Sequence, residues 1–439
     1  MRSRWSTAVQ VTTMVALLCL LLWRGDRWWV LAGCLLGLAA VLFWSFREVA
    51  AEEAAAAALP PGLPVSGADP PGIGQPLPVR EPHTVLTGHA AAVTALVFSP
   101  AGGLLVTGAR DGTAILWEIA DPARPVPVAS VAVPAARRRW RRRAGPEVGL
   151  GLRGRLLAVG GETVGMWDLT DPAQPAPIAI LPEPGRSRMA GHAVCFSPDG
   201  RLLAVGSMDI VVLWDVTDPA RPAPAGRLRT HRRLSLTPVN AVTFSPDGRL
   251  LVVDGGPDLV VFDVTEPARA AQVARCRMFP KSASTMAAAT SLAFGPAGRL
   301  LAVAGYSQNS TPYGSSQQSA VLLWDLTDPA RPARTASLVD RTGYRGRTRS
   351  RQRTARADPT TLTGHRGTVR AVAFGPDGRS MVSGGADGTA LFWEVTDPAH
   401  PRPTATFARP GAVPAVAISP DGQFLATGGA DATAALWSI

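Results

Sequence analysis

A repeated pattern of short apolar strands and two kinds of turn runs through residues 83–439, and it limits the possible folds more than any other feature. The pattern is clearest in residues 192–219 and 240–267, where apolar residues alternate with period two, as half-buried strands require. Ser-Pro-Asp-Gly or a variant separates the first two strands, because proline sets φ at the second turn position and glycine tolerates the last. This turn begins at Ser99, Ser197, Ser245, Gly295, Gly375 and Ser419. A second turn, Asp-Pro-Ala-Arg-Pro or a variant, ends the third strand, since proline cannot continue a β ladder.

The number of units follows from the aromatic residue near the end of each third strand. These residues are Trp117, Trp167, Trp214, Phe262, Trp324, Trp393 and Trp437. A repeat of this length, with four short strands per unit, is typical of a β-propeller. Seven aromatic positions therefore predict an all-β fold with seven blades.

Local motifs carry a family resemblance. Thr-Gly-His stands at 87–89 and 363–365, and residues 109–118 and 385–394 read ARDGTAILWE and GADGTALFWE. With these motifs the chain resembles the WD-repeat family over residues 83–439, and in particular actinobacterial proteins with an LWDLTDPARP phrase in each blade. The Gly-His pair is present only twice, and the second blade, around 147–168, has Leu-Arg-Gly at 152–154 in place of a full turn.

Closure of the ring should involve the start of the repeat region. The sequence ends at Ile439, two residues after Trp437, so the seventh blade lacks a fourth strand of its own. An unpaired strand edge is unfavourable, and in the resembling family an N-terminal strand closes the ring. Residues 83–87 are predicted to be that strand.

The N-terminus predicts a membrane anchor. Apolar stretches at 6–23 and 28–46 are each long enough to cross a bilayer as a helix, and only four residues separate them. We expect a transmembrane hairpin, followed by an Ala/Pro/Gly-rich linker over 47–82. Arginines at positions 2, 4 and 47 flank the open ends, against Arg24 and Arg27 in the turn, which favours both ends in the cytoplasm. Composition and resemblance indicate a bacterial cell membrane.

The histidines are compatible with either a catalytic or a structural role. His365, Asp387 and Ser383 could form a hydrolase triad. In the resembling family, such residues form a buried hydrogen-bond network together with Trp393, and the same reading applies to His89, Thr107, Asp111 and Trp117. The remaining histidines show no spacing typical of a zinc site. No nucleotide-binding motif occurs in a strand-to-helix context, so we expect no cofactor and no enzyme activity.

Positive charge is concentrated in three runs that contain no acidic residue. The runs at 137–143, 227–233 and 341–356 contain six, four and seven arginines, against a net charge of +11 for the whole chain. Each is expected to follow a fourth strand and to lie on one face of the ring. An insertion at 306–319 is expected to join the second and third strands of blade five on the same face. Partner-binding candidates in these segments are Arg137, Arg138, Arg139, Trp140, Arg141, Arg142, Arg143, Arg227, Arg229, Arg232, Arg233, Tyr306, Tyr313, Tyr344, Arg345, Arg347, Arg349, Arg351 and Arg353.

A further candidate set lies four residues before the last apolar residue of each first strand. It comprises Thr94, His192, Asn240, Thr290, Arg370 and Pro414, of which we take His192, Asn240 and Arg370 as possible contacts. These polar residues predict a ring at the channel mouth, although simple strand alternation would give a similar pattern.

Together these features predict a membrane-tethered interaction scaffold with a basic, aromatic-containing face for an acidic protein partner. The alternatives are binding of polyanions, meaning nucleic acid or anionic lipid, and a cryptic enzyme. No small-molecule substrate is expected.

Overall fold

The computed structural model describes residues 77–132, 149–161, 163–181, 193–207, 210–230, 239–279, 285–311, 314–345 and 364–439. Pro76–Ile439 forms one compact unit. Among these described residues, no helix is long and apolar enough to cross a membrane. The predicted spans at 6–23 and 28–46 lie outside them, as does the linker up to residue 76.

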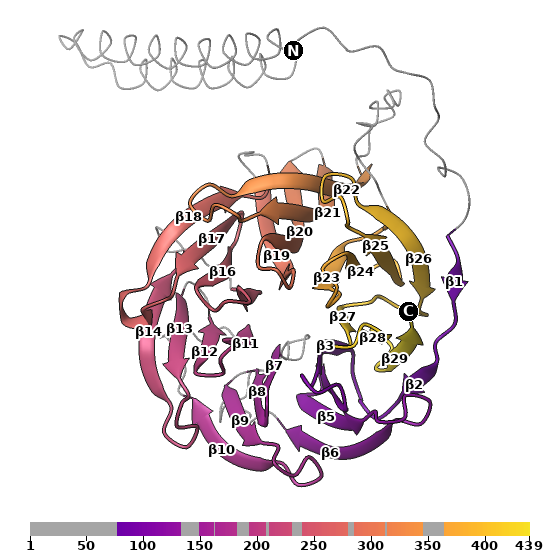
Figure 1. Ribbon diagram of the computed structural model, residues 1–439. Helices are drawn as coiled ribbons and strands as arrows, with labels where there is room; N and C mark the ends of the chain where they lie inside the picture. The colour runs from indigo at the N-terminus through magenta and orange to yellow at the C-terminus, as the bar shows by residue number, and fades with distance from the viewer. Residues whose placement is uncertain are drawn as a thin grey trace, which may run out of the picture. The chain divides into compact units, whose positions relative to one another are not determined.

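Seven antiparallel sheets stand around a central axis, which confirms the predicted seven-bladed β-propeller (Figure 1). In Figure 1 the first strand of each blade is nearest the centre and the fourth lies at the rim. Blades one to three are β3 (Val93–Phe98), β4 (Leu104–Ala109), β5 (Thr113–Glu118), β6 (Val126–Ala132); β7 (Gly149–Arg153), β8 (Leu156–Gly160), β9 (Val164–Asp168), β10 (Ala176–Leu181); β11 (Val194–Phe196), β12 (Leu202–Gly206), β13 (Ile210–Asp215), β14 (Ala223–Arg229).

The remaining blades continue in chain order. Blades four to six are β15 (Val242–Phe244), β16 (Leu250–Gly255), β17 (Asp258–Asp263), β18 (Ala271–Arg277); β19 (Thr285–Phe294), β20 (Leu300–Thr311), β21 (Gly314–Asp325), β22 (Ala333–Arg345); β23 (Val369–Phe374), β24 (Ser380–Gly385), β25 (Thr389–Glu394), β26 (Arg402–Ala408). Blade seven has β27 (Ala415–Ile418), β28 (Phe424–Gly428) and β29 (Ala434–Ser438), and a short 3₁₀ helix, η1 (Pro267–Arg269), precedes β18.

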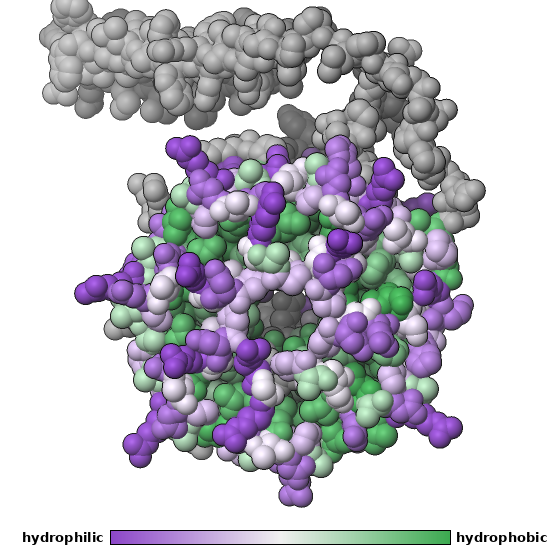
Figure 2. Space-filling view, in the orientation of Figure 1, coloured by the Kyte–Doolittle hydropathy of each residue, from purple (hydrophilic) through white to green (hydrophobic). Residues whose placement is uncertain are grey.

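The hydrophobic core lies between neighbouring blades. Trp167 of blade two shares one buried cluster with Val106 and Leu116 of blade one, and equivalent clusters join the other neighbours. Each aromatic residue predicted from the repeat lies next to the end of its third strand. Figure 2 shows the ring with a hollow at its centre.

The antiparallel order of each blade creates two faces. We call the face with the turns between first and second strands, such as 99–103 and 197–201, the turn face. The opposite face, with the turns between second and third strands, such as 110–112 and 386–388, is the connection face, because the chain also passes there from blade to blade. On the turn face, Ser197 donates its hydroxyl to Asp199 at 2.5 Å, and Gly200 has a φ of 76°, so the Ser-Pro-Asp-Gly turn forms as its residues predict.

The closing strand is confirmed. β2 (Thr84–Leu86) pairs antiparallel with β29, with Thr84 opposite Leu436 and Leu86 opposite Ala434. The backbone N–H of His83 adds a 2.7 Å hydrogen bond to the carbonyl of Leu436, and Leu86 is buried in the core.

A second N-terminal strand was not predicted. β1 (Val79–Arg80), in the segment assigned to the linker, pairs parallel with β26 at the rim of blade six. Leu77 packs against the cluster between blades five and six, and the Arg80 guanidinium donates to the carbonyl of Ser438 at 3.1 Å. The chain is therefore attached to two blades, six and seven.

The structure differs from two expectations about the connection face. The insertion at 306–319 is not a simple connection: β20 and β21 continue through it, with Tyr306 opposite Ser319 and Thr311 opposite Gly314. β19 and β22 are lengthened as well, so blade five has a four-stranded extension. In addition, two arginine runs do not follow their fourth strands but begin inside them, the second at Arg227 in β14 and the third at Arg341 in β22.

Candidate functional site

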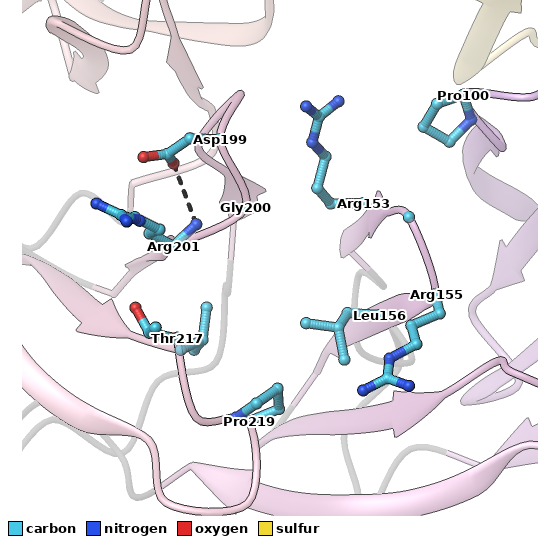
Figure 3. A pocket seen from close by; sticks show the side chains of 11 residues that line it. Pro100, Arg153, Arg155, Leu156, Asp199, Gly200, Arg201, Thr217 and Pro219 are labelled. Atoms are coloured by element: carbon cyan, nitrogen blue, oxygen red, sulfur yellow. Dashed lines mark hydrogen bonds between the residues drawn. The ribbon is translucent and has the colours of Figure 1, made fainter.

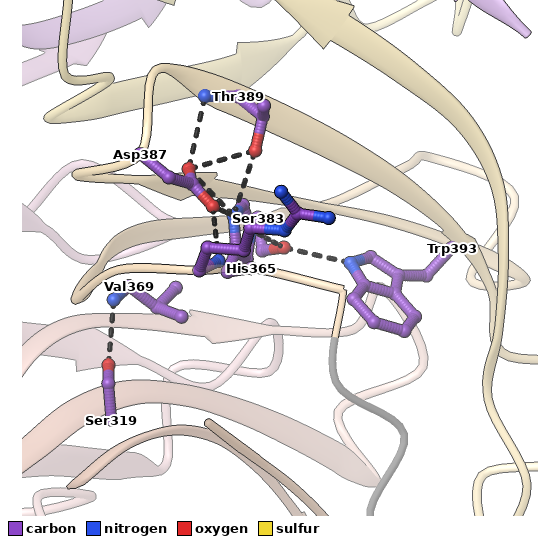
Figure 4. A network of polar contacts seen from close by, with 8 residues as sticks. Ser319, His365, Val369, Ser383, Asp387, Thr389 and Trp393 are labelled. Carbon is purple, nitrogen blue, oxygen red and sulfur yellow. Dashed lines mark hydrogen bonds and ion pairs between the residues drawn. The ribbon is translucent and has the colours of Figure 1, made fainter. Parts of the chain in front are cut away.

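Four side chains of blade six form one polar network (Figure 4). The Trp393 indole N–H donates to Ser383 Oγ at 2.8 Å, and Ser383 Oγ lies 2.8 Å from His365 Nε2. On the other side of the ring, His365 Nδ1 lies 3.2 Å from Asp387, which also accepts the Thr389 hydroxyl at 2.8 Å. If His365 Nδ1 carries the proton, every group in this chain has a partner of the correct kind.

Burial decides what this network can do. Ser383 is 0% exposed and His365 4% exposed, so no substrate can reach the serine hydroxyl in this conformation. Partial burial tends to raise the pKa of Asp387, but the hydrogen bond and charge of His365 lower that pKa well below its usual range. The network resembles a hydrolase triad in composition, yet its accessibility fits a structural role that fixes the blade.

Blade one repeats the arrangement. Trp117 donates to Thr107 at 3.0 Å, Thr107 lies 2.8 Å from His89 Nε2, and His89 Nδ1 lies 3.2 Å from Asp111. The structure thus brings together both sets of four residues singled out from the sequence.

Blade seven has two separate polar contacts at the corresponding positions, which were not predicted. Trp437 donates to Thr427 at 2.8 Å, and Arg409 stands 28 residues before Trp437, as His89 does before Trp117. The buried Arg409 guanidinium donates to Asp431 at 2.9 Å and to the carbonyl of Thr433 at 3.1 Å. The spacing of 28 residues from Trp437 indicates Arg409, whereas a search for histidine at this position does not.

Blades two to five carry apolar residues at the position of Thr107 and Ser383. These are Val159, Val205, Val253 and Val303, each buried. As a result, the indole N–H groups of Trp214 and Trp324 are buried without a hydrogen-bond partner among the described residues. Buried hydroxyl groups that accept the indole N–H therefore occur in three neighbouring blades, six, seven and one.

Neighbouring blades are joined by a hydrogen bond at the start of the first strand. The backbone N–H of Val93, Val239 and Val413 donates to the carbonyl of Gly429, Ser207 and Gly385 in the preceding blade, at 2.8 to 3.0 Å. At blades five and six, side chains replace that carbonyl. The N–H of Ala289 donates to Asp254 at 3.2 Å, and the N–H of Val369 donates to Ser319 at 2.7 Å (Figure 4).

The candidate ring at the channel mouth lies one residue further along these first strands. Asn240 is exposed and donates its amide to Asp254 at 3.0 Å, and Thr290 donates to the carbonyl of Val369 at 3.2 Å. Arg370 is exposed, whereas Thr94 and Pro414 are half-buried. His192 lies outside the described residues.

Of the partner-binding candidates, a minority can be located. Arg227 and Arg229 are exposed at the connection-face end of β14, where Arg229 pairs opposite Ile210. Tyr306 is half-buried in β20, and the backbones of Tyr344 and Arg345 belong to β22. The others lie outside the described residues: Arg137, Arg138, Arg139, Trp140, Arg141, Arg142, Arg143, Arg232, Arg233, Tyr313, Arg347, Arg349, Arg351 and Arg353.

No group of three or more His, Cys, Asp or Glu side chains suited to a metal ion occurs in the described part of the chain. One buried acid stands apart from the networks. Burial raises the pKa of Asp254 to about 7, although the N–H groups of Ala289 and Gly256 and the amide of Asn240 stabilise its ionised form.

Comparison with known families agrees with this geometry. The family model described as WD domain, G-beta repeat matches residues 80–118, 187–215, 358–394 and 401–438. These segments include the networks of blades one and six and the polar contacts of blade seven, within a ring of seven four-stranded units. The chain belongs to the WD-repeat β-propeller family. Three of the four matches thus cover blades one, six and seven, and the fourth includes β11, β12 and β13 of blade three.

Two curated proteins share parts of this WD-repeat sequence. The NAD(+) hydrolase ApTIR of an Actinoplanes strain is 35% identical over 104 residues, which are 24% of this chain and 12% of that protein. The small ribosomal subunit protein RACK1y of Oryza sativa subsp. japonica is 55% identical over 38 residues, 9% of this chain and 11% of that protein. The chain therefore spans about a tenth of the length of each relative, and these similarities do not assign it an activity.

Proposed function

We propose that this WD-repeat propeller is a membrane-tethered protein-interaction scaffold whose connection face binds an acidic protein partner. Propellers of this family generally act as non-enzymatic scaffolds for protein partners. The rigid ring supplies a frame, and its connections supply the arginine and aromatic side chains that dominate binding hot spots.

Exposed arginines at the connection face carry this proposal. Arg229 and Arg370 are exposed there and form no ion pair within the described residues. Other arginines of this face are paired, Arg277 with Asp258 at 3.2 Å and Arg409 with Asp431 at 2.9 Å. The three arginine runs contain no acid. The exposed guanidinium groups of this face, together with the runs, favour an acidic partner there, because carboxylates accept paired hydrogen bonds from arginine.

The tether of this scaffold would be the N-terminal segment. The apolar stretches 6–23 and 28–46 would form the anchor, and the charge distribution around them would keep the propeller in the cytoplasm of a bacterial cell. The linker joins the ring through β1 and β2, at the rim of blades six and seven.

Two variants with equal loss of charge test the face. In the first, the six arginines of 137–143 are changed to Ser. In the control, six exposed turn-face arginines are changed: Arg124, Arg221, Arg269, Arg331, Arg379 and Arg402. Each tagged full-length chain is used to capture proteins from extract of its own host cells.

The first variant should lose a specific captured protein that the wild type and the control retain. Loss in both variants, or in neither, would contradict the proposed face. Binding of a polyanion instead would show as capture of nucleic acid, or as tight binding to anionic vesicles, that weakens steeply as salt rises.

A further inference from the structure

From blade three to blade seven, each turn of the turn face contacts the turn of the next blade. A Cβ atom on Gly248 would lie 3.6 Å from Pro198 in the preceding blade's turn, and one on Gly298 would lie 3.5 Å from Pro246. Blades six and seven repeat this contact, with Gly378 against Pro296 and Gly422 against Pro376. In blades four to seven the turn glycine thus packs against the proline of the preceding blade's turn, whereas a Cβ on Gly102 of blade one would meet nothing within 4 Å.

Blade two breaks this series. Only Gly154 and Arg155 separate β7 from β8, whereas residues 197–201 separate β11 from β12, so the turn of blade two is three residues shorter. A Cβ on Gly154 would meet nothing within 4 Å. The glycine of blade three, Gly200, has no proline to pack against, and a Cβ atom on it would instead lie 3.2 Å from the Cγ of Arg153.

The missing turn leaves a cavity of about 540 Å³ (Figure 3). Its lining comes from the turns of blades one to three and includes Pro100, Arg153, Arg155, Asp199, Arg201 and Pro219. Figure 3 shows the Arg153 side chain standing between the turn of Asp199 and Gly200 and that of Pro100. The volume is in the range of ligand-binding clefts, roughly 300 to 1,000 Å³.

The lining is positively charged, with three arginines against one aspartate. Asp199 is occupied by its own turn, since it accepts the Ser197 hydroxyl at 2.5 Å and the Arg201 backbone N–H at 3.1 Å. Arg155 is 64% exposed and 3.8 Å from Asp168, a contact long enough to be exchanged. Arg153 is exposed, and no hydrogen bond or ion pair joins its guanidinium group to any other described residue.

We infer that this gap in the turn face, here called the blade-two gap, is a binding site for a carboxylate or phosphate group. Arg153 would hold the anion through its planar pair of N–H donors, with its stem fixed against Gly200. Arg155 can turn from Asp168 to supply a second guanidinium. The site lies on the face opposite the proposed partner surface, so it is a second binding site, separate from the first.

Chemical modification of arginine can test the gap site by site in the full-length chain. Phenylglyoxal reacts with accessible guanidinium groups, and peptide mass spectrometry reports the rate at each arginine. Inorganic phosphate, phosphoserine and glutamate are added separately, at an ionic strength matched with sodium chloride. A ligand at about twice its dissociation constant leaves roughly one third of the sites free, so Arg153 should react about threefold more slowly.

Arg379 is the internal control, because it follows a complete turn at the position in blade six that Arg155 occupies in blade two. Its rate should not change. The anion that protects Arg153 at the lower concentration identifies the group the gap prefers, phosphate or carboxylate. Equal slowing at Arg153 and Arg379, or no slowing at either, would overturn the inference.

Two variants sharpen the result. Arg153→Gln should abolish the protection of Arg155, whereas Arg379→Gln should leave it unchanged. Inserting Ser-Pro-Asp between Arg153 and Gly154 restores the length of the other turns and should fill the gap, with the same loss of protection. Undiminished protection of Arg155 in Arg153→Gln would show that Arg153 does not hold the anion. The arginines of 137–143 are read in the same digest, so failure here is distinguishable from failure of the connection-face proposal.

Discussion

In blades six, seven and one the third-strand tryptophan donates to a buried hydroxyl, whereas blades two to five have valine at the position of that hydroxyl, and blade four has Phe262 in place of the tryptophan. In the first group, the indole N–H groups of Trp393, Trp437 and Trp117 each donate to a buried hydroxyl. In the second group, Trp214 and Trp324 have no such acceptor. The first group also contains the closure of the ring, where β2 completes blade seven.

The irregular features of the propeller are concentrated in the second group. The shortened turn of blade two and the extension of blade five belong to it. The arginine runs lie between blades one and two, three and four, and five and six, so each run adjoins a blade of this group. We infer that directional hydrogen bonds fix the register of the blades around the closure. Packing of valine and tryptophan is sufficient for the remaining blades, whose connections carry the proposed binding surface.

The largest effect is expected at the closure itself. Deleting residues 83–87 removes β2, leaves β29 with an open edge and exposes the pocket of Leu86. We expect a loss of unfolding free energy of about 5 kcal/mol or more, because burial of one such leucine is already worth about 2 to 5 kcal/mol. Deleting residues 66–70 is the control for chain length. Equal melting temperatures for the two deletions would refute the closure.

Truncation of the tryptophans compares the two groups directly. Trp393→Ala should cost about 3 to 5 kcal/mol, because it opens a cavity and removes a donor from Ser383. Trp214→Ala should cost about 1 to 2 kcal/mol less, since it also removes an N–H that is buried without a partner. Denaturant unfolding of the chain truncated to residues 76–439 gives both values. A larger cost at Trp214 would contradict the distinction between the groups.

Two carboxyls, Asp254 of blade four and Asp387 of blade six, should make stability respond to pH in opposite directions. In the folded chain the pKa of Asp254 is raised to about 7, above its unfolded value of 3.8, so the folded state binds the extra proton between these values. The contribution of the Asp254 carboxyl to the unfolding free energy is therefore complete below about pH 4, and it decreases by about 2 to 4 kcal/mol as the pH rises to 7. The pKa of Asp387 is lowered on folding, so its contribution is present above 3.8 and is lost as the pH falls below it.

Comparison of variants isolates the contribution of Asp254. Unfolding of Asp254→Asn between pH 4 and 7 should show a flatter dependence than the wild type, while Asp387→Asn should keep the wild-type slope in that window. An unchanged slope in Asp254→Asn would contradict the assignment of the raised pKa to this buried carboxyl.

The smallest effects on the unfolding free energy are expected when the hydroxyl that accepts the indole N–H is replaced by valine in one group of blades, or introduced in place of valine in the other. Thr107→Val leaves the Trp117 indole N–H and the Nε2 atom of His89 without a hydrogen-bond partner and should cost about 1 to 3 kcal/mol. Val205→Thr gives the Trp214 indole an acceptor at the equivalent position, which offsets burial of the new hydroxyl, so its cost should be within about 1 kcal/mol of zero. Equal costs for the two exchanges would show that the networks have no special role.

The seven blades could be predicted because each turn has a local cause in its own residues. Proline and glycine in the turns, and an aromatic residue at the third strand, mark a unit without knowledge of its neighbours. The closing strand was also predictable, since a missing fourth strand leaves an edge that only a distant segment can cover.

The features that were missed depend on contacts between distant residues. β1 is two residues long and pairs with a strand more than 300 positions later, so Val79 and Arg80 carry no local signal. The polar segment 306–319 lacks apolar alternation, yet it forms strands because its neighbours β19 and β22 continue beside it. Arg409 replaces the histidine of a network by a different chemistry, and only its spacing from Trp437 indicates this role.

Photo-crosslinking from the two faces tests the proposed function most directly. A photoreactive residue is placed at Arg370, exposed on the connection face, or at Arg331, exposed on the turn face, in the full-length chain in its own cells. The account predicts a discrete protein adduct from position 370 and none from position 331, and the 370 adduct should disappear when the six arginines of 137–143 are changed to Ser. A protein adduct from position 331 alone, or an adduct from position 370 to nucleic acid or lipid rather than protein, would contradict it.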